Sequence, residues 1–279
     1  GSNYLVYTPE SHTTKFTVNT DYAALTARES AGINKRILTV KDFREAFSLC
    51  IDRTAFTTQF TAAAAPGYGL LNYMYHAILE DGSEACYRNV PAAKEALVNL
   101  YGIEYGEGKD YTTLDQAYAA ITGYDMAKAK EKMQAAYDYA VANNLYADGE
   151  TVKIRFSVYQ ADDIYVQIYE YVKGQLNEAA VGTSLEGKIE LEMFVDADYY
   201  NTLYAGETDV IFSTWGGATY GALTLLAQCY CDDYTGNGNQ MELGFNTDVY
   251  FVEFAIDGTT YKFSIKKWAD WLNGTVQLE

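Results

Sequence analysis

The clearest periodicity lies in the middle of the chain, where apolar and polar residues alternate. In residues 151–158, TVKIRFSV, every second residue is apolar, as in a strand that buries one face. Residues 188–195 alternate in the same way, and residues 210–212 form a short apolar run typical of a buried strand. The intervening segments, 162–180 and 197–205, have the apolar spacing of helices. This order predicts an α/β fold with a mixed, largely parallel sheet and helices on both faces.

An amphipathic helix is predicted after Thr39, because apolar residues recur there at the spacing of one helical face. These residues are Phe43, Ala46, Phe47, Cys50 and Ile51. Thr39 and Asp42 have the spacing of a capping box, in which side chains bind the free backbone N–H groups of the first turn. Arg53, near the end of the segment, is expected to pair with a carboxylate rather than with a ligand.

A second helix is predicted to begin after Asp125, which has a side chain suited to capping. Its apolar stripe predicts a buried face formed by Met126, Ala129, Met133, Ala136 and Tyr137. Residues 80–124 between the two helices are rich in Gly, Tyr and acidic residues. We interpret them as a variable surface region with short helices at 91–101 and 112–121.

Strands are also predicted toward both ends of the chain. Residues 15–20, KFTVNT, have the composition of a short strand. Residues 249–265 are predicted to form a hairpin, because the Asp-Gly pair at 257–258 favours a tight turn with positive φ. A short helix containing Trp268 and Trp271 is expected to follow.

The charge of the chain excludes some classes of partner. Among 279 residues, 38 are acidic and 20 are basic, so the formal net charge is −18. A nucleic-acid-binding protein would present a basic face, and an anionic membrane surface would repel this chain. The charge favours neutral or cationic ligands. No apolar run approaches the roughly 20 residues of a membrane span, and no signal peptide is present in this sequence.

Signatures of catalysis and of metal binding are missing from the sequence. It has no G-x-S-x-G, P-loop or H-E-x-x-H motif, and its two histidines have no partner pattern. Of the four cysteines, only Cys229 and Cys231 are closely spaced, whereas zinc sites use paired clusters. The many acidic residues are interpreted as solvated faces. We therefore expect a protein that is not an enzyme and that has no catalytic residue, metal or cofactor.

The stretch that follows the third predicted strand, TWGGATYG, is the candidate binding site. In open α/β sheets, ligands bind beyond the carboxyl ends of the strands, and Trp215, Gly216 and Gly217 lie at such an end. Glycines let the backbone approach a ligand, and a tryptophan ring can stack on one. A tight turn beside a buried tryptophan explains the same residues equally well. The pattern alone leaves both interpretations open.

Several segments in order resemble the extracellular solute-binding proteins of peptide-type ABC transporters. DFREAFSLCIDRTAF is similar to a helix of that family that reads V-R-x-A-x-x-x-A-I-D-R, and YDMAKAKEKMQAA is similar to its Y-D-P-x-K-A-K helix. GETVKIRFSV and DYYNTLYAGETDVIFSTWGG resemble its G-x-x-V-x-L strand and its Y-x-x-x-L-x-x-G-x-Y-D segment. The resemblance extends over about residues 37–230 and implies a two-lobed periplasmic-binding-protein-like type II fold.

The resemblance also implies a domain organisation. Residues 1–2, Gly-Ser, match a cloning scar, and residues 3–279 are expected to form a single C-terminal lobe. A helical and loop insertion is expected around residues 66–124. The other lobe of the same chain and a membrane permease are the implied partners. The implied location is the outer face of the cell membrane, with a lipid anchor, or the periplasm.

Family members that bind peptides imply which residues contact a ligand here. They often carry W-x-x-D after this strand, where the Asp pairs with the peptide amino group, and some carry an Arg three residues before the Trp. Trp215 matches that Trp, whereas Ala218 and Phe212 occupy the positions of the charged residues. The resemblance therefore implies ligand contacts from Trp215, Gly216, Gly217, Thr219 and Tyr220.

We expect the chain to be the substrate-binding lobe of an importer for peptides, which closes on its ligand together with a second lobe. A binder of sugars or metal complexes is an alternative within the family. A different alternative is an α/β hydrolase with two carboxylates about 5–10 Å apart in a cleft. A structural interaction module that uses exposed tyrosines is a further alternative.

Overall fold

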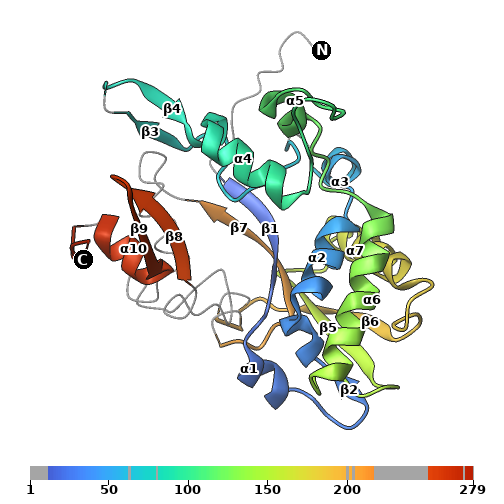
Figure 1. Cartoon of the computed structure of the whole chain (residues 1–279). Helices are drawn as coiled ribbons and strands as arrows, with labels where there is room; N and C mark the ends of the chain where they lie inside the picture. Colours follow the sequence, from blue (N-terminus) through green and yellow to red (C-terminus); the bar gives the residue numbers. More distant parts are fainter. Residues whose placement is uncertain are drawn as a thin grey trace.

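The structure is a computed structural model in which a central sheet is covered by helices (Figure 1). It describes residues 12–61, 64–79, 81–198, 201–202, 205–216, 251–272 and 274–278. In these residues no helix is both long enough and apolar enough to cross a membrane.

The main sheet is built around β5 (Thr151–Val158). Strands β2 (Ile33–Asn34), β6 (Ile189–Val195) and β7 (Val210–Gly216) all pair with β5 in parallel. Strand β1 (His12–Val18) pairs with β7 in the antiparallel sense. The predicted mixed, largely parallel sheet is therefore confirmed, with β1 close to the position expected for the N-terminal strand.

Alternation along β5 explains why this segment is a strand. Val152, Ile154 and Phe156 are buried on the face that the helices cover. Lys153 points to the other face, where its ammonium group lies 3.6 Å from Glu190 and 3.3 Å from Glu192 of β6. One face of the strand therefore belongs to the core and the other carries charge, as the two-residue period predicts.

Helices α6 (Met126–Ala142) and α7 (Asp163–Ala180) confirm both predicted segments, and α6 confirms the predicted cap at Asp125. Asp125 accepts a hydrogen bond from Lys128 N at 2.9 Å, and Asp162 accepts one from Tyr165 N at 3.1 Å. Ile168, Val172 and Leu176 of α7 are buried at helical spacing, whereas Ile164 in its first turn is 37% exposed. The short helix predicted at 197–205 falls partly outside the described residues.

The segment after Thr39 forms two helices rather than one, which corrects the prediction. Thr39 ends a 3₁₀ turn (Arg36–Thr39), and its hydroxyl donates to Arg36 O at 2.7 Å instead of capping the next helix. Helix α2 (Lys41–Leu49) begins after Val40 without a side-chain cap. Asp52 then starts α3 (Arg53–Phe60) by accepting a hydrogen bond from Ala55 N at 3.0 Å. A capping residue inside the apolar pattern divides the segment.

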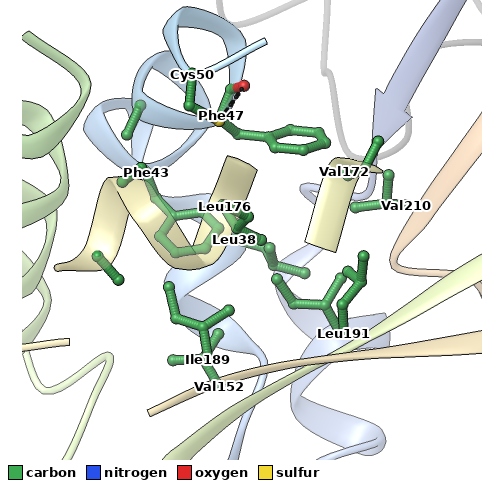
Figure 2. Packing of buried hydrophobic residues seen from close by; sticks show 14 of the residues in the cluster. Leu38, Phe43, Phe47, Cys50, Val152, Val172, Leu176, Ile189, Leu191 and Val210 are labelled. Carbon is green, nitrogen blue, oxygen red and sulfur yellow. Dashed lines mark hydrogen bonds between the residues drawn. The ribbon is translucent and has the colours of Figure 1, made fainter. Parts of the chain in front are cut away.

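The core lies between the sheet and helices α2, α6 and α7 (Figure 2). Phe43 and Leu176 meet side chains of the sheet such as Val152 and Leu191, and all four are buried. A cavity of about 10 Å³ remains between these layers, which is no larger than the space that one water needs. The core between these layers therefore leaves no room for a ligand.

Cys50 is expected to resist alkylation in the folded protein. It is fully buried at the end of α2, its thiol donates to Phe47 O at 3.2 Å, and burial raises its pKa to about 12. Because the thiolate is the reactive form, iodoacetamide near pH 8 should not label Cys50 until denaturant is added. Mass spectrometry of digested protein measures this, with the half-exposed Cys86 as the internal control. Labelling of both thiols at equal rates would contradict the burial of Cys50.

The insert, defined here as residues 66–124, has a small core of its own. It contains β3 (His76–Ile78), β4 (Glu84–Cys86), a 3₁₀ turn (Tyr87–Asn89), α4 (Pro91–Leu100) and α5 (Leu114–Ala119). Val98 of α4 packs on Ala117 of α5 and on Ile121, with tyrosines around them. Both predicted short helices are confirmed.

The predicted C-terminal hairpin and helix are also confirmed. Strands β8 (Phe251–Ile256) and β9 (Thr259–Ser264) are joined by the Asp-Gly pair at 257–258, and both residues have positive φ. Helix α10 (Ile265–Leu272) covers the hairpin through Trp268, whose indole N–H donates to Val252 O at 2.9 Å.

Candidate functional site

The sequence indicated that the third strand ends before Trp215, but strand β7 extends beyond that position. The strand continues through Trp215 and Gly216, which pair with Thr13 and His12 of β1. Because β1 supplies a partner for this last part of β7, the backbone here is extended rather than turned. Gly217, Thr219 and Tyr220, the other candidate contacts, lie outside the described residues.

The pairing of β1 with β7 brings Trp215 and Gly216 to the surface end of the sheet. At the other end of the ladder, Thr17 and Ile211 are buried. Near Trp215, the residues His12, Thr14, Thr214 and Gly216 are exposed. This exposed end is also the carboxyl end of β7, the place where ligands bind in open α/β sheets. We call it the ligand edge.

The insert reaches the ligand edge through one loop. The hydroxyl of Thr13 donates to Leu70 O at 2.8 Å, and Thr13 is the pairing partner of Trp215. This contact joins β1, at the start of the described chain, to the loop of the insert that precedes β3. The ligand edge is therefore bordered by the insert as well as by the strands.

Phe212 belongs to the core rather than to the ligand edge. Its ring centroid lies 5.0 Å from that of Phe16 and 5.8 Å from that of Phe56. Such spacings are typical of favourable aromatic pairs. The apolar residue at this position thus has a packing role, which explains why it is not charged. Ala218, the other departure from the peptide-binding pattern, lies outside the described residues.

Arg53 contacts neutral groups instead of the expected carboxylate. In the described part of the chain, its guanidinium donates to Gly123 O at 3.0 Å and to Ser48 Oγ at 2.9 Å. It also lies 5.8 Å from the ring centroids of Tyr68 and Tyr101, within the range of a cation–π contact. The residue connects α3 to the insert, and the prediction of an ion pair was wrong.

Asp209 is a buried charge whose role the sequence analysis missed. Its carboxylate contacts the Arg28 guanidinium, lies 2.5 Å from Lys35 Nζ and accepts from Arg155 N at 2.7 Å. Burial lowers the pKa of Lys35, and the charge of Asp209 opposes that effect. These contacts hold the start of β7 against β5. The available signal was an acidic residue directly before an apolar strand.

The acidic residues do not gather into a metal site in the described part of the chain. There, no three His, Cys, Asp or Glu residues lie close enough together to hold a metal ion. Cys229 and Cys231, the closely spaced pair, lie outside the described residues.

Solved structures of peptide-binding proteins resemble this fold. The substrate-binding domain of an oligopeptide ABC transporter from Bacillus anthracis strain Ames matches with a TM-score of 0.52 and 16% identity, over 85% of this chain and 35% of that chain. OppA of Listeria monocytogenes, solved bound to peptide, matches with a TM-score of 0.52 and 14% identity, over 83% and 35% of the two chains. This chain thus spans about a third of the length of these two proteins.

A shorter structure is matched over most of its own length. It is the peptide-binding protein of a peptide ABC transporter, with a TM-score of 0.50 and 18% identity, over 82% of this chain and 78% of that chain. At such identities the likeness establishes the fold, and the predicted binding-protein fold is confirmed. Among curated protein sequences, none matches this chain.

The sequence profile of one family matches most of the chain. The family is described as bacterial extracellular solute-binding proteins, family 5 Middle, and the match covers residues 2–237. It includes the segments on which the resemblance was based, from the helix around Arg53 to the strand that ends at Gly216. The chain therefore belongs to family 5 of the bacterial extracellular solute-binding proteins.

Proposed function

We propose that this chain is the ligand-binding second lobe of an ABC importer's solute-binding protein, and that its ligands are peptides. The observation that carries the proposal is the position of Trp215 and Gly216 in a strand that ends at the exposed carboxyl edge of the sheet. Membership of a solute-binding family supports binding rather than catalysis as the function of this edge.

The chemistry of the ligand edge favours ligands held by stacking and by backbone hydrogen bonds. A tryptophan offers a large apolar surface, and the neighbouring glycines let the backbone approach a ligand closely. The position three residues before Trp215 is filled by Phe212 of the aromatic core, so it supplies no charged anchor for a carboxylate. The net charge of −18 adds a preference for neutral or cationic peptides over acidic ones.

The proposed mechanism is closure of two lobes on the ligand. A ligand that touches both lobes stabilises the closed arrangement by its differential affinity for the two states, and a membrane permease reads that arrangement. The other, first lobe would come from the rest of a longer chain, since the two structures described first are about three times as long as the segment they share with this chain. The proposed location is the outer face of the cell membrane, with a lipid anchor, or the periplasm.

A thermal-shift screen of the full-length protein that contains this chain separates the candidate ligand classes. A pool of short peptides is expected to raise the melting temperature, because a ligand that binds only the folded state stabilises it by about 2.7 kcal/mol at one hundred times its Kd. Simple sugars and nickel chelates are expected to leave it unchanged. Stabilisation by sugars or chelates without any effect of peptides would reject the peptide assignment.

A further inference from the structure

Arg53 lies where the insert joins the rest of the fold. It is the first residue of α3, directly after the capping Asp52. One side of its guanidinium donates to Ser48 Oγ of α2, and the other donates to Gly123 O near the end of the insert. The same group lies against the rings of Tyr68 and Tyr101, at the two ends of the segment that contains α4. A single side chain therefore contacts the start, the middle and the end of the insert.

The backbone of the insert is shaped to receive this guanidinium. Gly123 has a φ of +64°, and a Cβ at this position would lie 1.5 Å from Arg53 Nη1 and 3.2 Å from the Tyr68 ring. A residue with a side chain would thus collide with the guanidinium and would also be strained in the left-handed region. Only glycine allows the arginine to reach the carbonyl group behind it.

A short series of contacts leads from Arg53 to the ligand edge. Tyr68 packs edge-on against Tyr101, with centroids 6.1 Å apart, and its carbonyl accepts from the Tyr101 hydroxyl at 3.2 Å. Two residues after Tyr68, Leu70 O accepts the hydrogen bond of Thr13. Thr13 pairs with Trp215 in the β1–β7 ladder. The loop that Arg53 holds is therefore the loop that contacts the end of this ladder.

We infer that Arg53 is a positioning residue for ligand binding: it holds the insert in place, and the insert forms one wall of the ligand edge and steadies the ends of β1 and β7. Arg53 itself does not contact the ligand. The positioning role of Arg53 can be tested in the protein without ligand, whereas the expected effect of Arg53 on ligand affinity rests on the proposed function. Lysine cannot replace the arginine, because it lacks the planar fork that reaches Ser48 and Gly123 at once.

Hydrogen–deuterium exchange of the full-length protein tests the positioning role without any ligand. In Arg53→Met, we expect exchange at least about ten-fold faster in α4 and at residues 12–14 and 214–216, and unchanged exchange in α7, because local opening does not need global unfolding. Gly123→Ala keeps the arginine but displaces its guanidinium, and the same pattern is expected. Arg88→Met is the matched control, since Arg88 belongs to the insert but stacks on Tyr73, 4.1 Å from the ring centroid.

Two exchange results would overturn the inference. One is faster exchange confined to α3 in both variants, and the other is an equal increase in α7, which would indicate general destabilisation. Titration with the peptide pool then tests the effect on affinity, with a Kd about ten-fold higher expected in Arg53→Met and no change in Arg88→Met. If the pool does not bind the wild type, the proposed function fails, and the exchange data still decide whether Arg53 positions the edge.

Discussion

Asp209→Asn is expected to lower the free energy of unfolding by about 3–5 kcal/mol. The carboxylate has no exposed surface and faces both Arg28 and Lys35. Removing its charge leaves two cations without a counter-charge in a buried site, and the cost of such a change exceeds the value of a surface ion pair. Urea denaturation at neutral pH, followed by circular dichroism, measures the difference.

Asp115→Asn is the control for the same chemical change at an exposed site. Asp115 pairs with Lys94 at 2.6 Å, but its side chain is 77% exposed, so a cost below about 1 kcal/mol is expected. The Asp209 carboxylate accepts a hydrogen bond from the backbone of β5 as well as binding the two cations, so the substitution is also expected to weaken the contact between β7 and β5. Equal costs for the two variants would mean that the buried charge cluster does not hold β7 in place.

Phe156→Ala is expected to destabilise the fold by about 3–5 kcal/mol through the cavity that it leaves. Phe156 is fully buried in β5, and its ring centroid lies 5.9 Å from that of Phe16 and 6.2 Å from that of Tyr169. The substitution therefore removes contacts to the edge strand β1 and to helix α7 together. Thermal unfolding and urea unfolding should both show this decrease in the free energy of unfolding.

The matched substitution on the surface is Phe251→Ala. Phe251 is 58% exposed on the hairpin, so its removal should change stability by no more than about 0.5 kcal/mol. A loss at Phe251 as large as that at Phe156 would show that the hairpin, rather than the sheet and its helices, determines the stability of the chain.

The local sequence pattern predicted the structure correctly where the position of a residue within its own helix or strand decides whether its side chain is buried. Residues 151–158 alternate because one face of β5 meets the helices and the other carries polar and charged side chains, so the strand was predicted with its correct bounds. The division between α2 and α3 was missed, because Cys50 and Ile51 continue the apolar period across the break. Asp52 is a residue type that favours the start of a helix, but the continuous apolar period predicted a single helix.

The candidate site depended on contacts that a local pattern does not contain. Trp215 and Gly216 are extended because β1, from near the other end of the sequence, pairs with them. The sequence predicted a carboxylate partner for Arg53 and gave Asp209 no role, whereas both contact residues distant in sequence. The edge of the sheet could be predicted from the order of its strands and the insert from the sequence around residues 66–124, whereas the contact between the two was found only in the structure.

The central claim is that the end of β7 binds peptides, and calorimetric titration of the full-length protein tests it most directly. The account predicts saturable binding of a short-peptide pool, with a Kd about ten-fold higher in Trp215→Ala and unchanged in Trp271→Ala, a tryptophan of helix α10. Peptide binding that is equally strong in wild type and Trp215→Ala, or no peptide binding at all, would contradict it.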